Sequence, residues 1–501
     1  MLTGEHNFLI VKSLGIDSYR ENIIFMRQDC EVCRSEGFTA LTRVVVSYGD
    51  KSIVATINVV VSEILHHSEA ALSIEGMKRL GVKDGDVIHV SHLKPIESLK
   101  KVRAKMYGNT LDDDSFIEII QDVIAGHYSN IELAAFISTC VGKRLTLQEI
   151  TSLTRAMLKT GQNIEWGSDK VFDKHCVGGL PGNRTTPIIV SIIAALGLMI
   201  PKTSSRAITS PAGTADTMET MTPVDLTLAQ MRKVVEKEGG CIVWGGAVQL
   251  SPADDVLISV ERSLDVDSEG QMIASVLSKK AAAGSTHVII DIPVGPSAKV
   301  RDPIAARHLC QSFTSVCEAI GLEVLVLQTD GSQPVGNGIG PALEAIDVLN
   351  VLKNKKDASV DLSDHALLLS GALLEMAGQC KTGEGIQQAR TVLENGKAYE
   401  KFIAICEAQG GFREPKTAPY TLDILSDHSG KVVGIDNRTV ARIAKLAGAP
   451  KASSAGIFFR TKLGKKIERG EPLLTIHAES IGELNYARDY ANTMNHFIKI
   501  Q

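Results

Sequence analysis

"KHCVGGLPGNRTTP", residues 174–187, is the segment that best indicates the fold class of this chain. It follows an apolar segment, passes through a glycine loop and enters a helical segment whose first turn holds Thr185, Thr186 and Pro187. A strand, a glycine loop and a helix in that order are typical of an α/β sheet. Glycines let the backbone approach an anion, so the loop is a candidate phosphate site. It lacks the spacing of a P-loop, and a structural tight turn explains it equally well.

Short apolar segments alternate with helical segments from residue 170 to about residue 415. This alternation predicts an α/β domain with much parallel strand pairing. Ligands of such sheets bind outside the carboxyl ends of the strands, where polar and mostly glycine-containing loops fall in this sequence. The expected strands are KVFDKHCV (170–177), LMIPKTS (198–204), CIVWG (241–245), HVIIDIPVG (287–295) and EVLVLQTDG (323–331).

The run TSSRAITSPAGTAD, residues 203–216, is a second candidate loop. It has six hydroxyl side chains, one arginine and no carboxylate before Asp216. Hydroxyl and amide donors without carboxylates suit a dianion that must stay charged. Clusters of Ser and Thr also cap helices, and residues 213–219 look like a helix start. Two such loops in one α/β sheet favour a shared phosphate pocket.

The rest of the 501-residue chain predicts further domains, so that the whole is a multidomain α/β protein. Residues 1–92 are β-rich, and the segments TRVVVSY and IVATINVVV predict a hairpin within a small barrel-like module. Residues 95–168, with a stretch near 262–283, have helical spacing and form a helical domain. Residues 170–415 form the α/β phosphate-binding domain, and residues 420–501 a C-terminal α+β domain.

Composition favours a small-molecule substrate in the cytoplasm. The net charge of −5 gives no reason to expect nucleic acid as a partner. No apolar stretch is long enough to span a bilayer, and no signal peptide is recognisable, so we expect no membrane partner. The nine scattered cysteines suit a reducing compartment. Cys30 and Cys33 form a lone C-x-x-C, for which ordinary burial is a better explanation than a metal or redox role.

A segment that follows the candidate loops places Ser275 and Lys279 four residues apart on one helical face, so both could face a cleft. A solvated lysine is an equally good explanation. Asp254 and Asp255 are candidate helix caps. The spacings of zinc metalloproteases, α/β-hydrolases and calcium sensors do not occur, and we expect no metal site. The glycine-rich GSQPVGNGIGP, residues 331–341, is a candidate hinge or lid.

With these motifs together, the sequence resembles the thymidine phosphorylase family, and specifically its long branch, which also contains AMP phosphorylases. SSRAITSPAGTADTME (204–219) is accompanied by KHCVGG (174–179), LSPADD (250–255) and ASVLSKK (274–280) in the expected order. The resemblance covers nearly the whole chain. Short members have Ser-Gly-Arg where this sequence has Ser204-Ser205-Arg206, and they lack the N-terminal β module.

The resemblance implies phosphorolysis of an N-glycosidic bond, in which inorganic phosphate attacks the anomeric carbon and the base leaves. It implies no cofactor, because phosphate is itself a substrate. The phosphate would be held by residues that match Lys174, Cys176, Thr186, Ser204, Ser205 and Thr214. Cys176 departs from the family, because a serine usually stands there and a thiol is a weaker donor.

The resemblance also implies a catalytic set and a nucleoside or nucleotide site. Asp267 matches the proton donor to the base in AMP phosphorylases, His175 contacts the nucleoside in relatives, and Lys279 stabilises the departing base together with Arg262 and Ser275. The nucleoside- or nucleotide-binding positions are Gly179, Arg206, Ala207, Ile208, Thr209, Ser210, Arg262, Ser275 and Lys299. A homodimer or larger homo-oligomer is expected.

The substrate stays open between a nucleoside and a nucleotide. Thymidine phosphorolysis to thymine and 2-deoxyribose 1-phosphate is the leading hypothesis. Phosphorolysis of AMP to adenine and ribose 1,5-bisphosphate needs an extra anion site, for which Arg206 and Lys299 are candidates. A transferase like anthranilate phosphoribosyltransferase, which would need magnesium, and a non-catalytic binding or assembly module are more remote alternatives.

Overall fold

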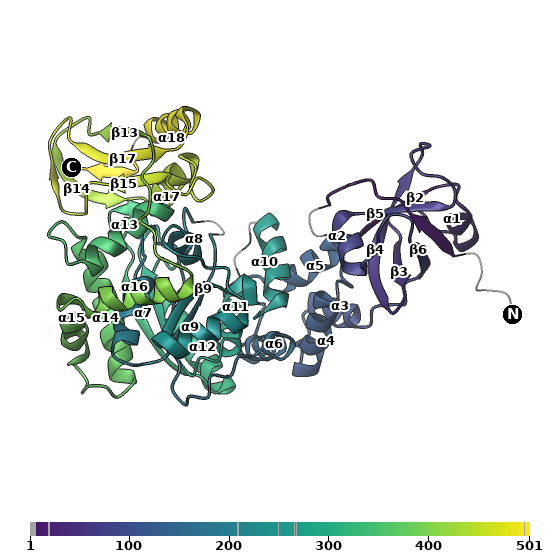
Figure 1. Cartoon of the computed structure of the whole chain (residues 1–501), viewed down its shortest axis with the longest axis horizontal. Coiled ribbons are helices and arrows are strands. Elements are labelled where there is room, and N and C mark those ends of the chain that lie inside the picture. The colour runs from purple at the N-terminus through teal and green to yellow at the C-terminus, as the bar shows by residue number, and fades with distance from the viewer. Residues whose placement is uncertain are drawn as a thin grey trace. The chain divides into compact units, whose positions relative to one another are not determined.

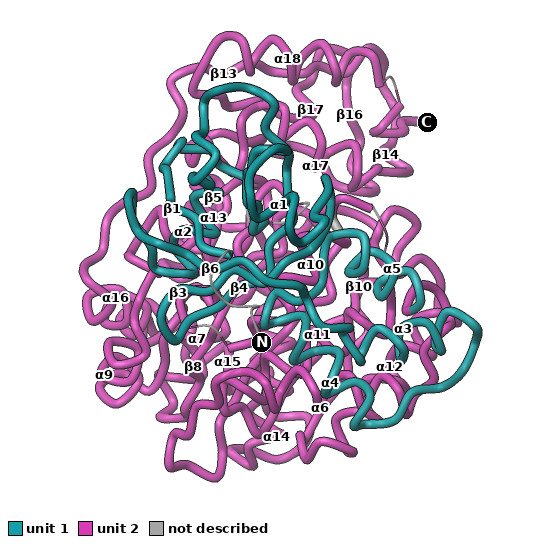
Figure 2. Tube along the Cα trace, turned by 90° about the vertical axis from the view of Figure 1, so that its right-hand side faces the viewer, with its two compact units in different colours: residues 1–139 teal, residues 140–501 magenta. Residues whose placement is uncertain are grey.

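A computed structural model describes residues 7–18, 21–207, 210–248, 250–264, 266, 268–494 and 496–501, without the side chain of Arg262. The chain divides into two compact units, residues 1–139 and residues 140–501, which Figure 2 shows in different colours. Among the residues so described, no helix has the length and apolar character needed to cross a membrane.

The first unit begins with a closed barrel, drawn in purple and blue in Figure 1. Its strand order is β1-β5-β2-β4-β3-β6, and the side chains of Ile24 and Met26 are fully buried inside it. The expected hairpin is confirmed, because β3 and β4 pair antiparallel with Tyr48 opposite Lys51. The elements are β1 (Phe8–Val11), β2 (Ile23–Arg27), α1 (Glu31–Glu36), β3 (Arg43–Tyr48), β4 (Lys51–Val60), β5 (Glu69–Leu72), α2 (Ile74–Leu80) and β6 (Val87–His92).

Cys30 and Cys33 lie in the core of this barrel, where both thiols are free and buried. Cys30 precedes α1 and accepts a hydrogen bond from the backbone N–H of Cys33 at 3.3 Å. Three further helices follow the barrel: α3 (Ser98–Met106), α4 (Asp113–Ile124) and α5 (Asn130–Cys140).

The second unit begins with a helix whose start is visible in the sequence. In α6 (Leu147–Thr160) the Thr146 hydroxyl accepts from the Glu149 N–H, and the Glu149 carboxylate accepts from the Thr146 N–H, which completes the capping box. This helix packs against α11 (Glu269–Ala282). Gly270 on α11 packs closely against this helix, since a Cβ there would lie 3.0 Å from a side-chain carbon of Ile150 on α6. The helix α10 (Pro252–Leu264) also contacts α6.

The α/β part of this unit has parallel strands, as the sequence predicts. A three-stranded sheet has the order β11-β10-β7, and a second parallel pair joins β8 to β9. An isolated parallel bridge between Val171 and Met199 leads from β7 toward β8. The carboxyl ends of parallel strands share one edge, so the loops that follow them meet there. The strands are β7 (Phe172–Cys176), β8 (Ile200–Ser204), β9 (Gly240–Trp244), β10 (His287–Val294) and β11 (Glu323–Asp330).

Helices surround these strands, and most residues of α7 belong to a large hydrophobic cluster. The residues of α7 are buried along almost its entire length, which explains why its sequence is apolar on every side. The helices are α7 (Thr186–Ala195), α8 (Thr214–Glu219), α9 (Leu228–Glu238), the 3-10 turn η1 (Gly245–Val248), α12 (Pro303–Ile320), α13 (Pro341–Leu352), α14 (Val360–Met376), α15 (Gly385–Glu394) and α16 (Lys397–Gln409).

The C-terminal part consists of two small sheets and two helices, drawn in yellow-green in Figure 1. One sheet has the order β12-β15-β17-β13 and the other β16-β14-β18. The elements are β12 (Gly338–Ile339), β13 (Tyr420–Leu425), β14 (Gly430–Ile435), α17 (Asn437–Leu446), β15 (Gly456–Phe459), β16 (Lys466–Ile467), β17 (Pro472–Ala478), α18 (Ile481–Thr493) and β18 (Ile498–Ile500).

The glycine-rich segment 331–341 is mostly buried. It contains β12, which pairs with β15 of the C-terminal sheet. The buried carboxylate of Asp347 accepts hydrogen bonds from the N–H groups of Asn337 and Gly338 at 2.5 and 2.6 Å. The glycines allow close packing here, since a Cβ on Gly338 would lie 2.2 Å from a backbone oxygen. A hinge or lid role for this segment stays a prediction.

Candidate active site

Arg184 joins the two loops that the sequence singles out. Its Nη1 donates to the Thr214 hydroxyl at 2.7 Å, and its Nη2 donates to the Ala212 carbonyl at 3.0 Å. Its Nε donates to the buried carboxylate of Glu344 at 2.7 Å. The glycine loop and the hydroxyl-rich run therefore lie side by side at the edge of the sheet. Arg184 is not among the residues that sequence analysis selected, although it lies inside the quoted stretch.

Lys174 is the buried cation of the glycine loop. Its Nζ donates to the Thr185 hydroxyl at 2.9 Å and lies 4.0 Å from Asp291 Oδ2. Thr185 is fully buried, and the next residue, Thr186, begins α7 and is 6% exposed. The residue that Lys174 contacts is thus Thr185, one position before the predicted phosphate ligand Thr186.

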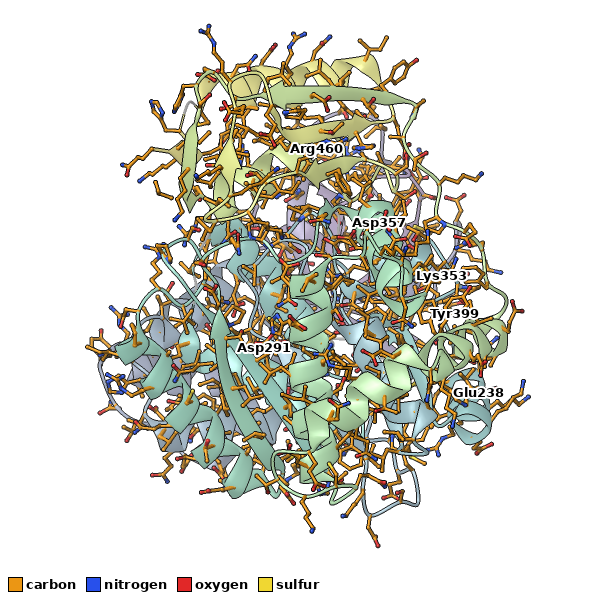
Figure 3. The ribbon with its side chains drawn as sticks, turned by 90° about the vertical axis from the view of Figure 1, so that its left-hand side faces the viewer. Glu238, Asp291, Lys353, Asp357, Tyr399 and Arg460 are labelled. Carbon is orange, nitrogen blue, oxygen red and sulfur yellow. The ribbon has the colours of Figure 1, made fainter. Side chains whose placement is uncertain are left out.

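Asp291 on β10 is the negative partner of this cluster (Figure 3). It is fully buried and accepts hydrogen bonds from the Thr329 hydroxyl at 2.6 Å and from Asn183 Nδ2 at 3.4 Å. His365 Nε2 on α14 lies 3.2 Å away. Burial alone would raise the pKa of Asp291, but His365 and Lys174 outweigh it and hold the pKa at about 2. Asp291 is not among the residues selected from the sequence; the available signal was a single carboxylate inside the apolar segment HVIIDIPVG.

Cys176 lies at the end of β7 next to these groups. Burial, reinforced by the charge of Asp291, raises the pKa of its thiol to about 12. The thiol is therefore protonated at neutral pH and can donate to an anion, whereas a thiolate would repel it. Asn183 Nδ2 lies 3.5 Å from its sulfur.

Four lysines surround His175. Burial lowers the pKa of His175 well below its usual value, and the charges of Lys280, Lys202, Lys279 and Lys174 lower it further. The imidazole is thus neutral. A neutral histidine among cations marks an electropositive site, which suits an anionic ligand.

Asp173 lies beneath this site and holds two of the lysines. Its carboxylate is fully buried, 3.1 Å from Lys202 Nζ and 2.7 Å from Lys280 Nζ. Burial lowers the pKa of Lys280 to about 7, despite the opposing attraction of Asp173. Together with Lys174 and Asp291, three buried lysines share two buried carboxylates. When all three lysines are charged, one positive charge is in excess, and a bound phosphate anion would balance it.

Ser204 ends β8 with a buried side chain that is 8% exposed. Within the described part of the chain, its hydroxyl oxygen has no hydrogen-bond partner. A buried hydroxyl without a partner is unfavourable, so a ligand that hydrogen-bonds to it would be stabilising. Ser205, by contrast, is exposed.

Ala207 and Ser210, two further predicted nucleotide contacts, make hydrogen bonds within this segment of the chain. The Ala207 N–H donates to Asp216 at 2.7 Å, and the Ser210 hydroxyl donates to the Ala212 carbonyl at 3.0 Å. The predicted nucleotide contacts Ile208 and Thr209 lie outside the described residues.

Arg206 is held by carboxylates rather than by the phosphate loop. Its guanidinium donates to both oxygens of Glu219 at 2.5 and 2.9 Å, and it lies 3.4 Å from Asp225. It also stacks over Trp244, 4.9 Å from the ring centroid. The hydrogen bond to Glu219, the largest of these effects, raises the pKa of Arg206. The structure therefore does not place Arg206 as an anchor for a second phosphate, because the carboxylates of Glu219 and Asp225 already balance its charge.

Lys279 and Ser275 lie on α11, as the spacing predicts. Lys279 Nζ donates to Asp254 Oδ2 at 2.7 Å, and the Asp254 side chain is buried in the first turn of α10. Ser275 is half-buried one turn earlier. Two further predicted contacts of the base, Asp267 and the side chain of Arg262, lie outside the described residues.

Gly179 and Lys299 come together from distant parts of the sequence. Gly179 has a φ of +84°, and a Cβ there would lie 2.4 Å from the Lys299 backbone nitrogen. Only glycine allows this approach. Two positions that the resemblance assigns to nucleotide binding are thus neighbours. Across the described residues, no group of three or more His, Cys, Asp or Glu side chains could hold a metal ion.

Comparison with known proteins agrees with this architecture. Residues 97–161 match the model "Glycosyl transferase family, helical bundle domain", residues 168–300 match "Glycosyl transferase family, a/b domain", and residues 431–497 match "Pyrimidine nucleoside phosphorylase C-terminal domain". A crystal structure of anthranilate phosphoribosyltransferase from Thermus thermophilus has the same fold, with a TM-score of 0.52 and 20% identity; the match covers 62% of this chain and 98% of that one.

Similar sequences extend along the full chain. A protein of Hahella chejuensis named "Putative thymidine phosphorylase" is 55% identical and is matched over 100% of this chain and 99% of its own length. A protein of Legionella pneumophila strain Corby with the same name is 57% identical over 96% of this chain and 93% of its own. The resemblance inferred from the motifs is thereby confirmed: the chain belongs to the thymidine phosphorylase family and is an enzyme of the pentosyltransferase class.

Proposed function

We propose that the enzyme catalyses phosphorolysis of a nucleoside, with thymidine and inorganic phosphate as substrates and thymine and 2-deoxyribose 1-phosphate as products. The cluster of buried lysines near neutral His175, which includes Lys174, carries this proposal, because it suits an anion that must remain reactive. Lys174, Cys176, Thr186, Ser204, Ser205 and Thr214 would hold the phosphate.

The reaction needs one bond to form and one to break. A phosphate oxygen forms a bond to the anomeric carbon while the bond from that carbon to the base nitrogen breaks, and the electron pair leaves with the base. Lys279 and Ser275, with Arg262, would stabilise the negative charge that develops on the base. Asp267 is the proposed proton donor to it. No cofactor takes part in this scheme.

AMP is the second candidate substrate, because Lys299 lies beside the glycine loop at Gly179, where a further phosphate could be bound. The ion pairs of Arg206 with Glu219 and Asp225 argue against a second anion site at the hydroxyl-rich run. Thymidine needs no such site, which is why it remains the leading candidate.

A substrate panel tests the proposal. The enzyme is incubated with phosphate and, separately, thymidine, uridine, AMP and CMP, and released base is measured by chromatography. Thymine release supports the proposal, adenine release from AMP supports the second candidate, and no release from any substrate excludes both. A parallel series with EDTA tests the absence of a metal requirement. We also expect a homodimer or larger homo-oligomer, measurable by sedimentation, that acts in the cytoplasm.

A further inference from the structure

We propose that Arg184 is a positioning residue for the attacking phosphate and that it acts through the Thr214 hydroxyl. This inference rests on the proposed function, since it concerns the same phosphate pocket. It adds a residue that neither the motif comparison nor the family resemblance assigns to the site.

The guanidinium of Arg184 contacts three separate groups at once. Its three nitrogens donate in three directions, to Thr214 on the hydroxyl-rich run, to the Ala212 carbonyl just before it, and to Glu344 on α13. Arg184 itself belongs to the glycine loop, two residues before α7. A planar guanidinium can make these contacts at once, whereas an ammonium cannot hold the same fixed directions. Arg184 therefore determines the spacing of the two loops.

The hydrogen bond from Arg184 determines the direction in which the Thr214 hydroxyl can donate its proton. A hydroxyl that accepts a hydrogen bond from a guanidinium keeps its own O–H free to donate elsewhere. Phosphate oxygens are acceptors, so a hydroxyl oriented in this way is a ready donor to them. Thr214 is only partly buried, which leaves its side chain accessible to a ligand.

The positive charge of Arg184 is balanced by the carboxylate of Glu344. Glu344 is 1% exposed, and its Oε2 accepts from both Arg184 and the Thr217 hydroxyl, the latter at 3.0 Å. Burial raises the pKa of Glu344, and the Arg184 charge opposes this by favouring the carboxylate. Since the guanidinium already has a counter-ion and three acceptors, it serves to position Thr214 rather than to bind phosphate itself.

The test compares R184K with the full-length wild type, using inorganic phosphate as the probe. R184K keeps the positive charge beside Glu344 but loses the divergent contacts. We expect the KM for phosphate and the Kd from phosphate titration calorimetry to rise about tenfold, as the loss of a charge-assisted hydrogen bond predicts. The KM for the nucleoside should change less than about twofold, because the base and sugar contacts lie elsewhere.

A double-mutant cycle with T214A identifies the route of the effect. If Arg184 acts through Thr214, R184K adds little further loss of phosphate affinity in the T214A background. Losses that multiply in the double variant, or equal increases in both KM values, overturn the proposal. R442M, at an exposed arginine on α17, is the control for a change of an arginine.

Stability and the proposed function are checked separately. Thermal unfolding tests whether R184K is folded. If R184K is unfolded, the variant R184M/E344Q, which removes both buried charges together, takes its place in the double-mutant cycle. A wild-type enzyme that binds no phosphate and releases no base refutes the proposed function. A wild type that does both, with unchanged phosphate affinity in the folded Arg184 variant, refutes this inference alone.

Discussion

At the scale of single residues, the site depends on the protonation states that burial and neighbouring charges set together. Cys176 is kept as a neutral thiol and His175 as a neutral imidazole, while Asp291 remains a carboxylate. These three states follow from neighbours that are distant in sequence. They allow Cys176 to donate to phosphate, and they leave the positive charge of the pocket on the lysines.

Replacement of Cys176 by serine should strengthen phosphate binding. A hydroxyl is a stronger donor than a thiol, so C176S should lower the KM for phosphate about two- to fivefold, within the net value of one hydrogen bond. Initial rates at varied phosphate measure this. C310S is the matched control, because Cys310 also has an amide nitrogen 3.5 Å from its sulfur but lies on α12. A higher phosphate KM in C176S would contradict the assignment.

Replacement of Lys279 by alanine should reduce turnover far more than stability. Without the cation, the base leaves with its negative charge less stabilised, and losses of about 100-fold in kcat are typical of such contacts. D254N is the companion variant: it removes the ion-pair partner at 2.7 Å but keeps the lysine. We expect D254N to retain more activity than K279A. Equal loss of activity and of unfolding free energy in K279A would make Lys279 a structural residue.

At the scale of elements, Asp173 ties together the three segments that carry the site. Its own strand β7 continues into Lys174, Lys202 lies on β8 just before Ser204, and Lys280 lies on α11 next to Lys279. Asp173, Lys202 and Lys280 thus each lie within two residues of a site residue in the sequence. A buried carboxylate between two lysines is stable only as a set, because removal of one partner leaves an uncompensated charge.

The stability contribution of Lys280 should depend on pH. Its pKa in the folded chain is about 7, below the value of about 10.4 expected when unfolded, so the folded state binds fewer protons between these values. The unfolding free energy of wild type should therefore rise relative to that of K280M as the pH increases from 7 to 9. Urea titrations at several pH values measure this difference. A constant or opposite trend would show that Lys280 is fully charged in the folded protein.

At the scale of the whole molecule, the described site residues all belong to the unit formed by residues 140–501. The N-terminal barrel is closed and has its own hydrophobic core. The relatives from Hahella chejuensis and Legionella pneumophila match over nearly all of their own length, so a long chain is shared among them. The barrel is therefore a module with its own core, separate from the unit that carries the site residues.

Deletion of residues 1–92 should change the oligomer size but leave part of the phosphorolysis activity. The remaining chain keeps every site residue, and the barrel strands pair only with one another in the described sheets. Sedimentation velocity and base release on the shortened chain measure the two effects. A folded, fully inactive deletion variant would instead support a binding or assembly role for the barrel in function.

The sequence alone predicts the parallel α/β domain and the barrel hairpin, because these depend on local patterns of apolar residues and turn residues. It also singled out Lys174, Ser204, Thr214 and Lys279 through short motifs. The folded structure alone shows that Arg184 links the two loops, that Asp291 adjoins both Lys174 and His365, and that Arg206 is neutralised by Glu219 and Asp225. Charge balance and hydrogen bonding between segments far apart in sequence set these outcomes, and no local pattern contains them.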